Sequence, residues 1–230
     1  MILETLGAFY HCYRDPEATR HVLRHFRRHY PVATVHLISD GGADFTEMAA
    51  EFGCVYFHER NIGLQIRTGK ETMHEWIRRV LRVCEQCPED WILTLEDDVL
   101  VRGKLHVPQY QIAGPRQGWQ LYNGRPIWPY IQSRHPELVN NGYGGGGGSM
   151  FNRRTAVACI RHYLDNEDFD EWRRMTGYVA SDIWLTTMFM VCGYQFGPGE
   201  DLAECIRDLD WRTSGRAVVH QPPREVLTGE

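Results

Sequence analysis

Three consecutive carboxylates, Glu96, Asp97 and Asp98, directly follow the apolar run that begins at Trp91. Hard divalent cations such as Mg²⁺ and Mn²⁺ prefer oxygen ligands, and Mg²⁺ sites commonly combine one or two carboxylates with substrate phosphates. Without a cation, adjacent carboxylates repel and raise each other's pKa. Strand alternation sends Glu96 and Asp98 to one side and Asp97 to the other, so the three need not share one role. A solvated acidic turn is the alternative, and the buried strand before the triplet argues against it.

Five consecutive glycines occupy positions 144–148. They do not follow a strand and open a helix with the GxGxxG spacing of a dinucleotide-binding loop. Because glycine lets backbone approach a ligand closely, the run is expected to form a wall of a pocket; a flexible loop is the alternative.

The strands and helices that must position these residues are indicated by the first hundred positions, where strand and helix patterns alternate. Strands are expected at 5–10, 33–39, 54–57 and 91–97. Helices are expected at 18–30, 45–52 and 73–84, from apolar residues that recur at helical spacing. This order predicts a parallel sheet with helices on both faces. Ligands of such sheets bind outside the carboxyl ends of the strands, which places "HCYRD", "SDGG", "HERN" and the acidic triplet along one rim.

The second half of the chain is rich in Gly, Pro and aromatic residues and predicts loops and short strands around a site. Helices are expected at 154–164 and 181–192, with Ser181 as the N-cap and Gly193 just past the end. The segment "DNEDFDEW" is interpreted as a solvated acidic surface. With 230 residues, the chain is expected to form one large domain.

Composition narrows the classes of protein to which this chain can belong. The 25 basic and 30 acidic residues give a net charge of −5 and are dispersed, which disfavours a nucleic-acid binder. No apolar run approaches the roughly 20 residues that span a bilayer, and the N-terminus lacks the pattern of a signal peptide. The seven cysteines are scattered, and the "CEQC" pair has neither a second pair nor a nearby His. We therefore expect reduced core cysteines in a cytoplasmic protein.

The sequence "LTLEDDVLV", after a half that contains "ISDGG" and "RNIG", resembles the acidic metal-binding motif of GT-A fold glycosyltransferases. The "EDD" form is similar to that of N-acetylglucosaminyltransferase I-like enzymes and of some family 2 enzymes. The resemblance implies an α/β fold, a three-layer α/β/α Rossmann-like domain with a mostly parallel central sheet. It also implies that residues 1–105 form a nucleotide-sugar-binding half and residues 106–230 an acceptor-binding half.

The resemblance implies roles for residues of the triplet and the rim. Asp98 would coordinate a Mn²⁺ or Mg²⁺ ion that bridges the donor phosphates, Asp97 would lie near the ribose or donor sugar, and Glu96 would act through water or support the site. Asp40 would hydrogen-bond a uracil or ribose, with a simple Asp-Gly turn as the alternative. Other residues would bind the nucleotide or its diphosphate: Phe9, Tyr10, Arg14, Arg60, Asn61 and Arg67.

A second segment, "ASDIWLTTMFMVCGY", resembles the helix of inverting GT-A enzymes whose first turn carries the catalytic base. That position is Asp182, although Ser181 replaces the first acid of the usual pair. The alternative is an acidic residue that only stabilises the helix dipole. His220 lies where many GT-A enzymes carry a histidine ligand to the metal; a structural histidine is the alternative.

These features predict a metal-dependent, inverting glycosyltransferase that uses a UDP- or GDP-sugar and a saccharide or glycoconjugate acceptor. The cation would stabilise charge on the leaving diphosphate, and Asp182 would deprotonate the acceptor hydroxyl. Several aromatic residues are candidates for stacking on sugars or for the core: Trp119, Trp128, Tyr130, Tyr143 and Trp184. A nucleotidyltransferase and a non-catalytic nucleotide- or sugar-binding domain are the alternatives.

Overall fold

The computed structural model describes residues 1–63, 69–115, 122, 124–177, 179–204, 212–213 and 215–222. Two predicted ligand-contacting residues, Arg67 and Trp119, lie outside the described residues.

A seven-stranded sheet forms the centre of the molecule, in the order β3-β2-β1-β4-β7-β6-β8. Its first four positions are taken by β1 (Gly7–Cys12), β2 (Val35–Asp40), β3 (Val55–Glu59) and β4 (Trp91–Leu95), which pair in parallel. Strand β7 (Met150–Asn152) runs antiparallel between β4 and β6 (Ile112–Gly114), and β6 pairs in parallel with β8 (Phe196–Pro198). The predicted α/β class with a mostly parallel sheet is confirmed.

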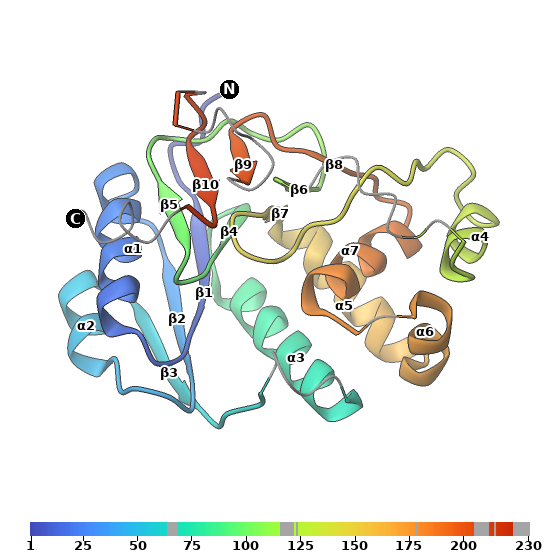
Figure 1. Cartoon of the computed structure of the whole chain (residues 1–230), viewed down its shortest axis with the longest axis horizontal. Helices are drawn as coiled ribbons and strands as arrows, with labels where there is room; N and C mark the ends of the chain where they lie inside the picture. The colour runs from blue at the N-terminus through green and yellow to red at the C-terminus, as the bar shows by residue number, and fades with distance from the viewer. Residues whose placement is uncertain are drawn as a thin grey trace.

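Helices cover both faces of this sheet (Figure 1). On one face lie α1 (Pro16–His29) and α2 (Thr46–Phe52), whose apolar residues share a cluster with Ala8 and Tyr10 of β1. On the other face lie α3 (Lys70–Gln86), α5 (Arg153–Asn166) and α7 (Ser181–Val191), which share a second cluster with Phe9. Neighbouring residues of β1 therefore face opposite layers, because side chains alternate along a strand. The three-layer arrangement expected from the sequence is present.

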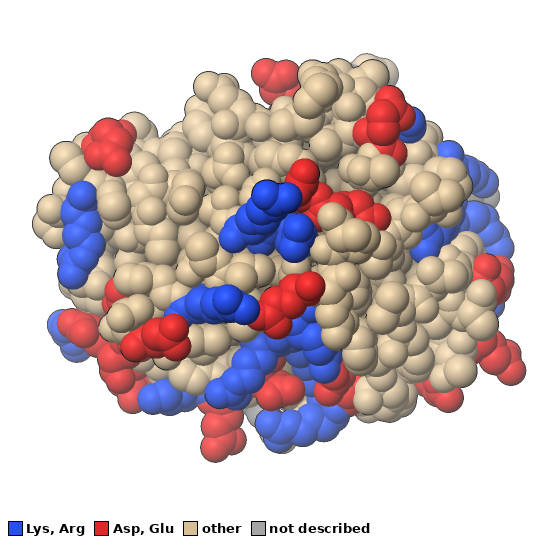
Figure 2. Space-filling view, turned by 180° about the vertical axis from the view of Figure 1, so that it is seen from behind, with Lys and Arg blue, Asp and Glu red and all other residues tan. Residues whose placement is uncertain are grey.

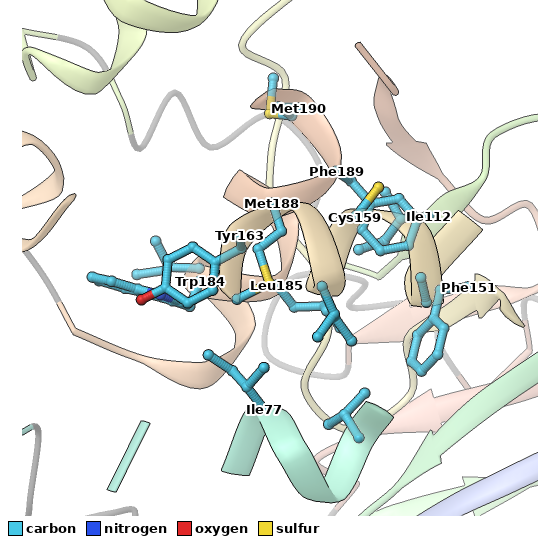
Figure 3. Close-up of a cluster of buried hydrophobic side chains, with 14 of the residues drawn as sticks. Ile77, Ile112, Phe151, Cys159, Tyr163, Trp184, Leu185, Met188, Phe189 and Met190 are labelled. Carbon is cyan, nitrogen blue, oxygen red and sulfur yellow. The ribbon is translucent and has the colours of Figure 1, made fainter. Parts of the chain in front are cut away.

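The second cluster is broad and joins residues of α3, α5 and α7 to residues of the sheet (Figure 3). Helix α7 is apolar on all sides, and each residue from Ile183 to Val191 is buried. A helix that is hydrophobic all round belongs in the interior, so α7 is held as a rigid element. Trp184 is fully buried among Tyr163, Phe169 and Trp172, which assigns it to the core rather than to a sugar-stacking surface.

Two local predictions differ from the structure. Ala180, not Ser181, is the N-cap of α7, because the extended backbone ends at Ala180 and Ser181 is already helical. The acidic segment near 168 is not only solvated surface: Asp168 caps α6 (Phe169–Thr176) by accepting a hydrogen bond from the Glu171 backbone N–H. The remaining short helix, α4 (Ile127–Gln132), was not expected either.

A small second sheet forms beyond the acidic triplet, in the order β5-β10-β9. Strand β5 (Val99–Val101) pairs antiparallel with β10 (Val218–His220), which pairs in parallel with β9 (Leu202–Glu204). His220 stands opposite Val99 in this register, and the Gln221 backbone N–H donates to the Asp98 carbonyl at 2.8 Å. The C-terminal region is thereby fastened to the residues that follow β4.

Lys and Arg side chains are interspersed with Asp and Glu side chains on the face shown in Figure 2. Within the described residues, no helix is both long and apolar enough to cross a membrane.

Candidate active site

The acidic triplet turns away from the sheet where β4 ends at Leu95. The Val99 backbone N–H donates to the Glu96 carbonyl at 3.1 Å, which closes the turn. Asp97 points toward α1, where its Oδ1 accepts hydrogen bonds from the hydroxyls of Tyr10 (2.7 Å) and Thr19 (3.0 Å). Glu96 and Asp98 point the other way, toward β10. This is the division that strand alternation predicted, although the three residues lie in a turn beyond the end of β4.

Glu96, Asp98 and His220 form a potential metal-binding group, because one ligand atom from each lies within 4.8 Å of the others. His220 Nε2 is 3.5 Å from Asp98 Oδ1 and 3.9 Å from Glu96 Oε2. The structure thus places Glu96 beside Asp98 and His220, whereas the sequence interpretation gave it only an indirect role.

The chemistry of this group suits a hard divalent cation. Asp98 Oδ1 is buried and accepts no hydrogen bond from the residues that the structure describes. A buried carboxylate oxygen without a donor is costly unless a positive charge compensates it. Two carboxylates and one imidazole would offer such a cation oxygen and nitrogen ligands.

The electrostatics of Glu96 point the same way. Burial raises the pKa of its carboxyl, and the nearby charges of Asp98 and Asp182 raise it further. His220 and the Gly147 backbone N–H lower the pKa of Glu96 and oppose this effect. Asp98 and Asp182 therefore lie close enough to Glu96 to disfavour its ionised form, and a bound cation would stabilise the charged carboxylates.

The glycine run passes between the metal-binding group and α7 and is held on both sides. Gly147 N–H donates to Glu96 Oε1 at 2.9 Å, and Gly148 N–H donates to the carbonyl of Thr94 in β4 at 2.9 Å. At its start, Gly144 N–H donates to Thr186 Oγ1 of α7 at 2.8 Å. These bonds argue against the alternative of a flexible loop.

Asp182 lies across this run from Glu96. It is the second residue of α7, and its Oδ1 accepts the backbone N–H of Ile183 at 2.8 Å. A Cβ built on Gly146 would lie 3.9 Å from Asp182 Oδ2 and 3.7 Å from Glu96 Oε1, so both carboxylates face the same small space. The rigid packing of α7 sets the position of Asp182 relative to the metal-binding group.

Asp40, at the end of β2, belongs to a buried ion pair that the sequence did not indicate. Its Oδ1 accepts hydrogen bonds from Arg79 Nη1 (2.8 Å) and from the Ile62 backbone N–H (3.0 Å). Arg79 of α3 is 1% exposed, and its Nη2 donates to the Arg60 carbonyl at 2.8 Å. The pair therefore ties the ends of β2 and β3 to α3. No residue-type signal marks Arg79, because an arginine on an amphipathic helix normally lies on the solvent face.

Comparison with known proteins gives matches only in structure: no family model and no curated protein matches this chain. The galactosyltransferase LgtC, solved in complex with donor and acceptor sugar analogs, is 14% identical; the match covers 94% of this chain and 87% of LgtC at a TM-score of 0.52. The apo-form glycosyltransferase GlyE of Streptococcus pneumoniae is 11% identical; the match covers 97% of this chain and 55% of GlyE at a TM-score of 0.53. The fold is the GT-A fold. The chain spans about half the length of GlyE.

The GT-A fold explains why two predicted ligand contacts are enclosed. Phe9 and Tyr10 are 1% and 0% exposed, because β1 is a central strand with helices on both faces. Neither side chain is exposed for a contact with a nucleotide, and the Tyr10 hydroxyl instead donates to Asp97 Oδ1. Three other predicted donor-binding residues, Arg14, Arg60 and Asn61, are exposed at or near the carboxyl ends of β1 and β3.

His11 lies next to the Asp40–Arg79 pair and is expected to make the stability of the folded protein sensitive to acid. Burial lowers the pKa of His11 to about 4, and the charge of Arg79 also lowers it, against the opposing effect of Asp40. Its Nε2 lies 3.0 Å from Arg79 Nη1, so the neutral ring accepts a hydrogen bond that protonation would remove. Because the folded pKa is below the unfolded value of 6.5, this contribution to stability is complete above pH 6.5 and is lost toward pH 4.

We expect His11→Gln, which keeps an acceptor but does not titrate, to show a smaller fall in the free energy of unfolding between pH 6.5 and 4 than the wild type. Urea denaturation at several pH values measures this difference. Equal pH dependence in the two proteins would contradict the assignment.

Proposed function

We propose that this protein is a metal-dependent, inverting glycosyltransferase that moves a sugar from a UDP- or GDP-sugar to a hydroxyl group of a saccharide or glycoconjugate. The observation that carries the proposal is the placement of Glu96, Asp98 and His220 across Gly146 from Asp182, beyond the end of β4. In open α/β sheets this end is where ligands bind. The likeness in fold to LgtC, solved with donor and acceptor sugar analogs, supports the same class of reaction.

Asp98 and His220 would hold the cation, Mn²⁺ or Mg²⁺, with Glu96 as a third ligand or as its direct neighbour. When bound, the cation supplies Lewis-acid stabilisation of the charge that develops on the leaving diphosphate. Asp97 keeps the triplet in place through its hydrogen bonds to Tyr10 and Thr19. We therefore assign Asp97 a positioning role on the donor side.

Asp182 acts as the general base in this proposal. Its carboxylate takes the proton of the acceptor hydroxyl while the oxygen attacks the anomeric carbon. The new carbon–oxygen bond forms on the face opposite the bond to the diphosphate, which breaks as the nucleoside diphosphate leaves, so the anomeric configuration inverts. The positive end of the α7 dipole favours the ionised carboxylate before each turnover.

The donor nucleotide is assigned to residues 1–105 and the acceptor to residues 106–230. The exposed Arg14, Arg60 and Asn61, together with Arg67, would contact the nucleotide and its diphosphate. Asp40 is held by Arg79 with one carboxylate oxygen, and we assign its second oxygen to the base or ribose. A cytoplasmic location is proposed because free thiols, as in the buried Cys84 and Cys159, are maintained in that compartment.

The test is to incubate the protein with a panel of UDP- and GDP-hexoses, a mixture of saccharide acceptors and Mn²⁺ or Mg²⁺. We expect release of nucleoside diphosphate from at least one donor, loss of the activity in EDTA, recovery on addition of Mn²⁺, and a product of inverted configuration by NMR. Donor binding without release would indicate a binding domain, and pyrophosphate formed from a nucleoside triphosphate and a sugar phosphate would indicate a nucleotidyltransferase. Retained configuration would remove Asp182 as the base of a single displacement.

A further inference from the structure

The glycine run contains one glycine that the fold does not require. Gly145 and Gly148 adopt left-handed backbone conformations, with φ of +114° and +74°, which side chains disfavour. Gly144 and Gly147 are crowded: a Cβ would lie 2.7 Å from Phe196 Cε2 in the first case, and in the second 3.0 Å from His220 Nε2, which would have to shift. Structure alone therefore accounts for these four glycines.

Gly146 differs in both respects. Its φ lies outside the left-handed range, and a Cβ there would make only ordinary contacts, 3.6 Å from Asp182 Cβ and 3.7 Å from Glu96 Oε1. Alanine would thus fit at this position and would reduce the conformational entropy of the unfolded chain, which usually stabilises a protein. Gly146 is also the one member of the run that is partly exposed, while the other four are buried.

The free space at Gly146 lies where the transferred sugar must be. Glu96 belongs to the group that would hold the cation and the diphosphate, and Asp182 is the proposed base. In a single displacement the anomeric carbon lies between the leaving diphosphate and the attacking oxygen, and therefore between these two carboxylates. Gly146 borders this gap, because a Cβ on it would lie 3.7 Å from Glu96 Oε1 and 3.9 Å from Asp182 Oδ2.

We infer that Gly146 is the floor of the donor-sugar subsite and that its missing side chain makes room for the pyranose ring of a hexosyl donor. The inference rests on the proposed function and adds a residue that determines the size of sugar the site accepts. A methyl group at this position would occupy the space between Glu96 and Asp182 without displacing either residue.

The test measures binding, by calorimetry in Mn²⁺, of a UDP- or GDP-hexose that the wild type binds and of UDP or GDP alone. We expect Gly146→Ala to lower the affinity for the nucleotide-sugar at least about tenfold, which is the scale of one misplaced methyl group in a specificity pocket. The affinity for the nucleoside diphosphate should stay within about twofold of the wild type. Gly146→Val should weaken the nucleotide-sugar further. Thermal unfolding should show Gly146→Ala to be at least as stable as the wild type.

Gly103→Ala is the matched control, because a Cβ there meets only Ala217 at 3.5 Å, and its φ is also outside the left-handed range. It should bind both ligands as the wild type does. Equal affinity of wild type and Gly146→Ala for the nucleotide-sugar would overturn the inference. An equal loss of affinity for the nucleotide-sugar and the nucleoside diphosphate, or a lower thermal stability of Gly146→Ala, would overturn it as well. Absence of binding by the wild type to any of the nucleotides would instead refute the proposed function.

Discussion

Asp182→Asn is expected to lower kcat for sugar transfer by about 10²–10⁴-fold, the usual contribution of a general base. Asparagine has nearly the same shape and retains an oxygen that can accept the Ile183 backbone N–H, so the start of α7 should be preserved. Because Asp182 acts on the acceptor in this proposal, the Kd for the donor should stay within about threefold of the wild type. Steady-state transfer rates and donor calorimetry measure the two quantities.

Asp170→Asn offers a matched control, because Asp170 is also an acidic residue in the first turn of a helix, α6, but is exposed away from the triplet. It should transfer sugar at the wild-type rate. If Asp182→Asn also retains full turnover, Asp182 serves only the helix terminus, and the base must be another group.

Asp98→Ala is expected to weaken Mn²⁺-dependent nucleotide binding at least about 100-fold. Removing a residue that only hydrogen-bonds a metal ligand commonly lowers metal affinity about 10–100-fold, and the loss of a ligand itself should be at least as large. The physical reason is the position of its buried Oδ1, 3.5 Å from His220 Nε2, where the carboxylate would bind the cation directly. Calorimetry with Mn²⁺ and UDP or GDP measures the loss, and activity should fall with it.

The neighbouring Asp97→Asn separates the roles within the triplet. Asp97 accepts hydrogen bonds from Tyr10 and Thr19 on the opposite side, so its replacement should lower the melting temperature and change Mn²⁺ affinity by less than tenfold. Unchanged Mn²⁺-dependent binding in Asp98→Ala would contradict the metal site. A larger loss of Mn²⁺ affinity in Asp97→Asn than in Asp98→Ala would reverse the assignment of the two carboxylates.

Much of the donor-side architecture was predictable because its signals are local. The helical spacing of Met73, Trp76 and Ile77 and the apolar run before Glu96 depend only on near neighbours in the chain, and both elements are present. The ends of parallel strands meet at one edge of a sheet, so the rim that joins Asp40 to the triplet also followed from element order. The start of α6 was missed because its acidic residues fit both a solvated surface and the first turn of a helix.

The sequence by itself determined the fold class, the position of Glu96, Asp97 and Asp98 at the end of a core strand, and the placement of Asp182 in the first turn of a helix. The structure decided that the strand ends at Leu95 and that the three carboxylates lie in the turn that follows it. Only the tertiary structure decided that Glu96 joins Asp98 and His220, that Arg79 is buried against Asp40, and that Gly146 lies between Glu96 and Asp182. These features depend on the pairing of β5 with β10, more than a hundred residues apart, and on the packing of α3 and α7. Residue type and spacing do not encode such contacts, because register and burial are set by the whole set of packed elements.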